Sequence, residues 1–252
     1  MPDLLRSAII IPLICLAAMV FSTLAVLFSL VDKRGVWQHW CARTWCWIVA
    51  ALAGMRVRVQ GAEHIPRSRP CIFAANHQSY LDIPALFAAL PVEFRFLARQ
   101  SLFSVPFLGW FLWRAGHIPI DRERARSALT NLNRAAEKLR AGCSTVIFPE
   151  GTRSADGILQ AFKSGGFKLA LKAGVPIVPV TIIGTHHILR RDSLVFHPGE
   201  VEIIIDPPLE MDGYSNRTLP ELMERTRSCI AAHLKQEAPT PFDLPDCARV
   251  DS

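Results

Sequence analysis

Hydrophobic residues are concentrated at the start of the chain. Ser7–Val31 is a run of 25 residues without a formal charge, rich in Ile, Leu, Val and Ala. As a helix this run would be about 37 Å long, which exceeds the ~30 Å hydrocarbon core of a bilayer. A secretory signal peptide has a shorter apolar region and a small-residue cleavage site, which the sequence around Leu30–Asp32 does not supply. The pattern therefore predicts an uncleaved transmembrane anchor over residues 1–34.

The next segment, residues 35–55, has a different pattern. Four of the six Trp lie in it. Its large apolar side chains recur at helical spacing: Trp37, Trp40, Trp45, Ile48 and Leu52. A Trp-rich amphipathic helix suits the bilayer interface, and it suits packing on a protein core equally well. Arg43 argues against a second full span, because a charge inside the bilayer is costly.

Beyond Arg56, short β-rich runs alternate with helical patterns. The predicted strands are residues 56–60, 71–75, 94–98, 144–148, 177–183 and 201–205, and the predicted helices are residues 80–90, 122–141, 165–173 and 219–236. This interleaving predicts an α/β domain over residues 56–236, with a mixed, largely parallel sheet flanked by helices. Residues 237–252, with three Pro and four acids, are predicted to form a flexible tail.

One apolar segment inside this domain has two interpretations. Leu102–Trp113 is uncharged over 12 residues but contains Pro106 and Gly109. It is too short to cross a bilayer, and Pro106 interrupts a simple helix. A buried loop fits this pattern, and so does a surface that dips toward lipid or lines an apolar substrate cleft.

Composition and charge agree with a basic domain tied to a membrane. The 252 residues are 50% hydrophobic and 20% charged, with a mean hydropathy of +0.24. The net charge of +6 lies beyond residue 31, since residues 1–31 hold one Arg and one Asp. Lys33 and Arg34 follow the apolar run after Asp32 and favour a cytoplasmic location for the domain. Seven Cys without a C-x-x-C pair indicate free thiols rather than a disulfide framework.

Residues suited to proton transfer follow one predicted strand. Asn76–Asp82 reads N-H-Q-S-Y-L-D and comes directly after residues 71–75, at a strand end where α/β sheets commonly carry active sites. His moves protons near neutral pH, and a carboxylate bound to one ring nitrogen fixes its tautomer. We therefore expect His77 to act as a base oriented by Asp82. Alternatively, Asp82 with Ser79 only caps the following helix.

Three further blocks accompany this one. Phe148–Arg153 reads F-P-E-G-T-R and follows another predicted strand. Gly116–Arg122 leads into the predicted helix at residues 122–141, and Val175–Val180 leads into the predicted strand at residues 177–183. Gly151 permits unusual backbone angles, and Arg153 offers a bidentate fork for phosphate. His186, His187 and His197 match no usual metal-ligand spacing, so no metal site is predicted.

Taken in chain order, the blocks at residues 76–82, 116–122, 148–153 and 175–180 resemble the N-H-x4-D, G-x5-R, F-P-E-G-T-R and V-P-x-x-P-V motifs of the glycerolipid acyltransferase family. The resemblance covers roughly residues 56–210 and is greatest to the bacterial 1-acylglycerol-3-phosphate acyltransferases. It implies that His77 is the general base and that Asp82 orients it. It also implies an acceptor site formed by Arg99, Arg122, Glu150, Gly151, Thr152 and Arg153. Arg99 stands where family members often have Lys, and the planar guanidinium of Arg contacts phosphate with a different geometry from the point charge of Lys.

The implied reaction moves an acyl group from an acyl thioester to the sn-2 hydroxyl of a lysophospholipid in the membrane. The donor would be acyl-CoA or acyl carrier protein, and no bound metal or organic cofactor is required. For the acceptor, 1-acylglycerol-3-phosphate is expected from the resemblance. A lyso-ornithine lipid, another lysophospholipid or glycerol-3-phosphate are the alternatives.

Three other functional classes fit the sequence less well. Ser79 lies two residues from His77, as a serine hydrolase would require a serine near its base, but the sequence contains no G-x-S-x-G elbow. A non-enzymatic membrane-surface adaptor would explain the anchor and the basic charge, yet not the joint occurrence of the first and third blocks. Nucleic-acid binding is disfavoured because the basic residues are scattered and no known module is present.

Overall fold

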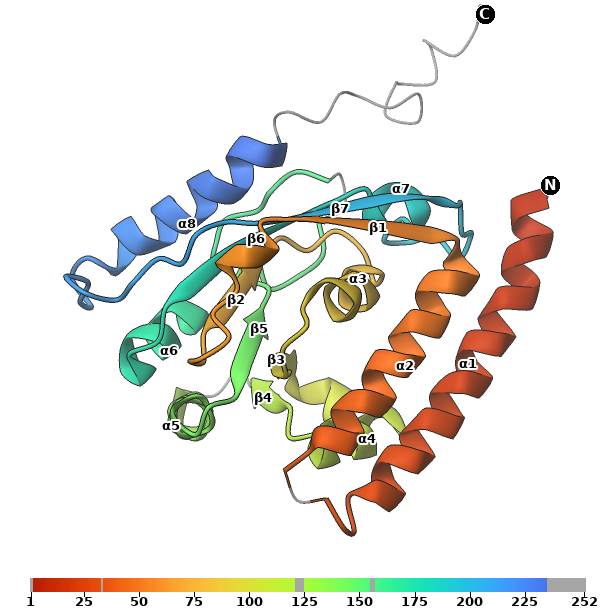
Figure 1. Ribbon diagram of the computed structural model, residues 1–252, viewed down its shortest axis with the longest axis horizontal. Coiled ribbons are helices and arrows are strands. Elements are labelled where there is room, and N and C mark those ends of the chain that lie inside the picture. The colour runs from red at the N-terminus through yellow and green to blue at the C-terminus, as the bar shows by residue number, and fades with distance from the viewer. Residues whose placement is uncertain (1, 33, 121–124, 155–156, 235–252) are drawn as a thin grey trace, which may run out of the picture.

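The computed structural model describes residues 2–234 apart from 33, 121–124 and 155–156. The tail predicted over residues 237–252 lies outside these described residues. One sheet runs through the protein, and helices cover both of its faces (Figure 1). Its strands are β1 (Met55–Gln60), β2 (Ile72–Ala75), β3 (Phe94–Arg99), β4 (Ile118–Ile120), β5 (Ser144–Ile147), β6 (Ile177–Ile183) and β7 (Gly199–Ile205). The helices are α1 (Pro2–Phe28), α2 (Val36–Ala53), α3 (Asp82–Ala89), α4 (Leu108–Arg114), α5 (Ala125–Arg140), α6 (Gly165–Ala173), α7 (Thr185–Ile188) and α8 (Leu219–Leu234), with short 3₁₀ helices η1 (Ala62–His64) and η2 (Gln100–Ser104).

The strands follow the order β1-β7-β6-β2-β5-β3-β4. From β6 to β4 all neighbours are parallel, whereas β7 is antiparallel to β6 and parallel to β1. The predicted mixed, largely parallel sheet is therefore confirmed. β4 was not predicted; it is a three-residue edge strand that contains Pro119. Its position agrees with the tolerance of sheet edges for proline, which cannot donate to a ladder.

Alternation along the central strands divides the core into two layers. In β2, Phe73 and Ala75 join a cluster that includes residues of α2 and α3, whereas Ile72 and Ala74 join residues of α5, α6 and α8. All four side chains are fully buried. Because successive strand residues point to opposite faces, a strand covered on both sides has an unbroken hydrophobic sequence.

α1 and α2 form an antiparallel pair beside the sheet, with α1 outermost (Figure 1). The Asp32 carboxylate accepts backbone N–H groups at the start of α2, including that of Trp37 at 2.8 Å. Trp45 Nε1 donates to the Ile14 carbonyl at 3.4 Å, and Arg6 donates to the Leu52 carbonyl at 2.8 Å. The inner face of α2 packs in the core, while three of its Trp remain exposed: Trp37, Trp40 and Trp47.

The apolar segment Leu102–Trp113 forms part of η2, a short link and most of α4. Six of its large apolar side chains are exposed: Leu102, Val105, Phe107, Leu108, Trp110 and Trp113. The interpretation of this segment as a buried loop is therefore wrong, and an exposed apolar surface is what the structure contains. This surface adjoins α1, since α1 and α4 are in contact. We refer to the six exposed side chains as the α4 apolar surface.

Candidate active site

The first and third motif blocks, which were expected to carry chemistry, lie at one edge of the sheet. β2, β5 and β6 are parallel, so their carboxyl ends point the same way. His77 comes two residues after β2, and Glu150 comes three residues after β5. Asn76 fixes the loop after β2 to β6: its side-chain amide donates to the Ile182 carbonyl at 2.8 Å and accepts from the Ile182 N–H at 2.7 Å. This edge is the usual location of active sites in open α/β sheets.

His77 and Asp82 form a direct pair, as the sequence predicts. His77 Nδ1 lies 2.7 Å from Asp82 Oδ2, and the Asp82 side chain is fully buried while 16% of the His77 side chain is exposed. The same Oδ2 accepts the backbone N–H groups of Gln78 at 2.8 Å and Ser79 at 2.9 Å. Because the carboxylate accepts the proton on Nδ1, the neutral ring has its lone pair on Nε2. Asp82 thus orients His77 and does more than cap a helix.

An aromatic ring fixes the plane of the imidazole. The ring of Phe148 stacks on His77 with centroids 3.9 Å apart and an interplanar angle of 15°. Phe148 is the first residue of the F-P-E-G-T-R block, and the sequence analysis gave it no role. Stacking and the Asp82 bond together restrict both the tilt and the rotation of the ring, so Nε2 keeps one direction. Such restriction is what a positioned general base requires.

Glu150 holds the first and third blocks together. Its side chain is buried, Oε1 accepts the His77 N–H at 2.7 Å, and Oε2 accepts the Gln160 N–H at 2.8 Å. Burial raises the pKa of the Glu150 carboxyl, while the two backbone N–H groups and His77 act in the opposite direction. The Ser154 N–H also donates to the His77 carbonyl at 2.8 Å. Glu150 therefore positions the loop that carries His77.

Arg153 lies beside the loop between β2 and α3, residues 76–81, which carries His77 and which we refer to as the catalytic loop. Its guanidinium carbon is 3.6 Å from the centroid of the Tyr80 ring, and Tyr80 is three residues from His77. Nη1 of Arg153 donates to the Arg191 carbonyl at 3.1 Å, and Arg191 donates to the Arg153 carbonyl at 3.0 Å. The carboxylate of Glu150, three residues before Arg153, is bound to backbone N–H groups instead. The guanidinium is thus oriented by an aromatic face and a carbonyl.

The other predicted acceptor residues are placed less closely around His77. Gly151 has a φ of 79°, the left-handed conformation that favours glycine, and Thr152 is exposed. Arg99 ends β3, two strands from β2 in the sheet, or about 10 Å at the usual strand spacing, and its side chain is exposed. Arg122 lies outside the described residues.

The geometry argues against Ser79 as a nucleophile. Its hydroxyl is fully buried, donates to the Leu189 carbonyl at 2.7 Å and accepts the Leu81 N–H at 3.2 Å. A serine nucleophile needs its oxygen exposed to substrate and bound to the base. In this structure Ser79 instead connects the catalytic loop to the segment after α7.

Thr185 also contacts the pair and was not predicted. Its hydroxyl donates to Asp82 Oδ1 from α7, 103 residues away in sequence. It follows the V-P-x-x-P-V block, but no local pattern marks it, because the contact exists only once β2 and β6 are neighbours. Among the described residues, no group of three or more His, Cys, Asp or Glu side chains could hold a metal ion.

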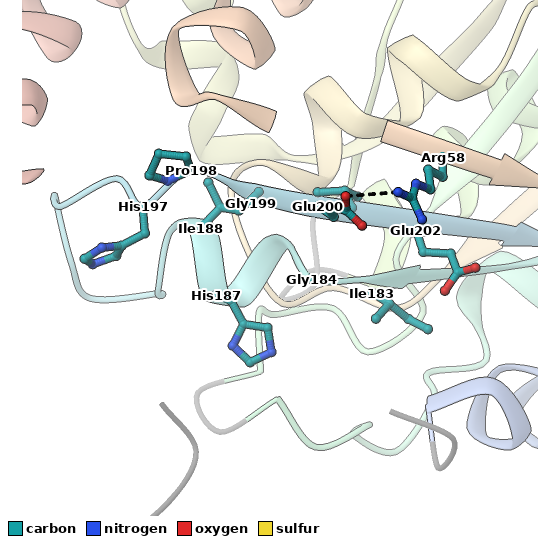
Figure 2. Close-up of a pocket in the computed structure, with 11 residues that line it drawn as sticks. Arg58, Ile183, Gly184, His187, Ile188, His197, Pro198, Gly199, Glu200 and Glu202 are labelled. Carbon is teal, nitrogen blue, oxygen red and sulfur yellow. Dashed lines mark hydrogen bonds and ion pairs between the residues drawn. The ribbon is translucent and has the colours of Figure 1, made fainter. Parts of the chain in front are cut away.

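A pocket of about 420 Å³ lies between α7 and the start of β7 (Figure 2). Its lining includes Ile183, His187, Ile188 and the ion pair between Arg58 and Glu200, at 3.1 Å. His77 and Asp82 do not line this pocket. The pocket is an open groove along the start of β7 rather than a cavity beside His77.

Comparisons with known proteins identify the family of the chain. A family model described as Acyltransferase matches residues 56–183. The 1-acyl-sn-glycerol-3-phosphate acyltransferase of Pseudomonas aeruginosa is 30% identical over 241 residues, covering 93% of this chain and 92% of that protein. The chloroplastic enzyme of the same name, BAT2, from Brassica napus is 37% identical over 178 residues, covering 70% of this chain and 51% of that protein. The chain thus spans about half the length of this chloroplast relative.

A solved structure extends the similarity to the whole fold. The crystal structure of the 1-acyl-sn-glycerophosphate (LPA) acyltransferase PlsC from Thermotoga maritima matches with a TM-score of 0.80 and 26% identity, over 95% of this chain and 98% of that chain. The match includes the α1–α2 pair as well as the sheet, since it leaves only a twentieth of the chain uncovered. With its motifs in these positions, the chain belongs to the acyltransferase family.

Proposed function

We propose that the protein transfers a fatty acyl group from an acyl thioester to the sn-2 hydroxyl of 1-acylglycerol-3-phosphate, making phosphatidic acid. The observation that carries this proposal is the buried Asp82 bound to His77 Nδ1 at 2.7 Å, which leaves Nε2 of the partly exposed ring to take a proton. The names of the relatives support the acceptor. Acyl-CoA or acyl carrier protein supplies the thioester, and the chemistry needs no bound metal or organic cofactor.

The reaction is a direct displacement. The acceptor hydroxyl oxygen attacks the thioester carbonyl carbon while His77 Nε2 takes the hydroxyl proton. The tetrahedral oxyanion then collapses, the carbon–sulfur bond breaks, and the thiolate leaves and takes the proton from His77. Asp82 stabilises the imidazolium that exists between these two proton transfers. Gly151, Thr152 and Arg153 lie on the loop that the Ser154 N–H connects to the His77 carbonyl, and they form the acceptor side of the site, while Arg99 and Arg122 complete the phosphate contacts.

An assay of the purified full-length protein in detergent tests this function. We expect acyl-CoA or acyl carrier protein with 1-acylglycerol-3-phosphate to give phosphatidic acid, detected by mass spectrometry. A lyso-ornithine lipid, lysophosphatidylcholine and glycerol-3-phosphate serve as competing acceptors. Preference for one of these would replace the proposed acceptor, whereas absence of acyl transfer to all of them would contradict the function.

We further propose that α1 anchors the protein and that the catalytic domain faces the cytoplasm, where acyl thioesters are available. Of the helices in the described part of the chain, α1 alone is long and apolar enough to cross a membrane, with a mean hydropathy of 2.6 over its most apolar window. The α4 apolar surface adjoins α1. A bilayer that receives α1 would cover this surface too, and the membrane-resident acceptor would reach the site from it. Burial of exposed Trp at the interface is favourable.

Lipid contact by α4 is testable with brominated phospholipids, which quench Trp fluorescence within the bilayer. In a chain whose other Trp are replaced by Phe, we expect the fluorescence of Trp110 to be strongly quenched in reconstituted vesicles. Its side chain is 55% exposed and lies on the α4 apolar surface. A matched chain with its single Trp at position 228, by Ser228→Trp on α8, should be quenched far less. Equal quenching at the two positions would contradict lipid contact by α4.

A further inference from the structure

The Asp82 carboxylate is held by donors on both of its oxygens. Oδ2 accepts His77 Nδ1–H and two backbone N–H groups, all within the catalytic loop. Oδ1 accepts the Thr185 hydroxyl. Both Asp82 and Thr185 are fully buried. A buried carboxylate oxygen without a donor is costly, so the hydroxyl satisfies an oxygen that water does not reach.

The backbone around Thr185 is fixed in several places. Gly184 joins β6 to α7 with a φ of 91°, and a Cβ at this position would lie 2.3 Å from the Glu200 carbonyl oxygen. At the other end of α7, the Leu189 N–H donates to the Thr185 carbonyl at 3.0 Å, and the Leu189 carbonyl accepts the Ser79 hydroxyl. The segment from Gly184 to Leu189 therefore contacts the catalytic loop at two points, one of which is the Asp82 carboxylate.

We propose that Thr185 is a positioning residue for the acyl-transfer reaction, acting through Asp82 on His77. With Oδ1 bound to Thr185, the carboxylate does not rotate about its Cβ–Cγ bond, and Oδ2 keeps its direction toward Nδ1. Loss of this bond leaves Oδ1 without its donor and the carboxylate held through Oδ2 alone, which loosens the orientation of the imidazole without removing any group that contacts substrate. The inference rests on the proposed role of His77 as the base and adds a residue from outside the first and third blocks.

Three variants isolate the hydroxyl. Thr185→Val keeps the shape and removes the donor, and we expect kcat to fall roughly 10- to 100-fold, as misplacement of a catalytic group does. KM for the acceptor and for the thioester should stay within about twofold, because Thr185 does not contact substrate. Thr185→Ser retains a donor and should keep most of kcat. Thr226→Val is the matched control: Thr226 is fully buried in α8, and its hydroxyl donates to Leu222 within the same helix.

A double-mutant cycle tests whether Thr185 acts through Asp82. In an Asp82→Asn background, Thr185→Val should cause little further loss of kcat, because the carboxylate that it orients is already absent. Additive losses in this cycle would overturn the proposal, and so would a folded Thr185→Val enzyme with unchanged kcat. Thr185→Ala provides a second variant without the hydroxyl and should show the same loss. If neither variant folds while Thr226→Val does, the hydroxyl is structural and the proposal is overturned.

The same experiments separate this inference from the function on which it rests. Retention of acyl transfer by His77→Ala would remove the assigned base and with it the proposed mechanism. An inactive His77→Ala protein beside a fully active Thr185→Val protein would leave the mechanism in place and refute only the role of Thr185.

Discussion

His77→Ala should lower kcat for acyl transfer by at least about 10²-fold while the protein stays folded, since general-base assistance is typically worth 10²- to 10⁴-fold. The His77 side chain is partly exposed and stacks on Phe148 rather than lying in the hydrophobic core, so its removal leaves the core intact. KM for the acceptor should change little, because His77 removes a proton in the transition state rather than holding the ground state. Initial rates on the purified variant, with circular dichroism for folding, measure both effects.

A second His–Asp pair in the chain provides the matched control. His233 Nε2 lies 3.0 Å from Asp206 Oδ1, and both side chains are partly buried. This pair joins α8 to the end of β7. His233→Ala and Asp206→Asn should keep wild-type kcat, whereas Asp82→Asn should lose activity along with His77→Ala. Near-normal turnover in folded His77→Ala protein would show that the proton goes elsewhere.

Every described strand except β4 was predictable to within two residues at each end. The central strands β2 and β6 are buried on both faces and have largely apolar runs, whereas the edge strand β1 alternates Val with Arg and is mostly exposed. β6 and α6 begin and end where the pattern places them, at Ile177–Ile183 and Gly165–Ala173. β4 could not be found in this way, because three residues with a central Pro carry no periodicity and its pairing with β3 is a tertiary feature. The placement of Leu102–Trp113 on the surface likewise depends on its neighbour α1, which no local pattern indicates.

The chemistry at the sheet edge was predictable where motif residues contact one another. His77 and Asp82 are five residues apart, so one loop suffices to bring them together. The groups that hold this loop come from elsewhere in the sequence: Glu150 after β5, Thr185 after β6, and the ring of Phe148. Their roles depend on the strand order, in which β2 lies between β5 and β6. Sequence spacing alone contains no information on that order.

The acceptor phosphate gives the second large expected effect. Arg153→Ala should raise KM for 1-acylglycerol-3-phosphate about 10- to 100-fold, the equivalent of a lost hydrogen bond to a charged group at roughly 1.5–3 kcal/mol. A guanidinium has five N–H donors. Among the described residues, the bond to the Arg191 carbonyl uses one donor and the Tyr80 ring covers one face, so the edge of the guanidinium is the part that we expect to bind phosphate oxygens. Arg153→Lys should restore affinity only in part, because a point charge does not reproduce the bidentate fork.

Three comparisons isolate the phosphate contact in Arg153→Ala. KM for acyl-CoA should stay within about twofold of wild type, because the change concerns the acceptor alone. Arg225→Ala is the matched control, since Arg225 is exposed on α8 and donates to the Tyr214 hydroxyl at 3.3 Å, away from the base. It should leave both KM values unchanged. With monoacylglycerol, which lacks the phosphate, the wild-type and Arg153→Ala enzymes should be equally slow. If Arg153→Ala left KM for 1-acylglycerol-3-phosphate unchanged, the phosphate would be held elsewhere at this sheet edge, with Arg99 the next residue to replace, while proton removal by His77 would still stand.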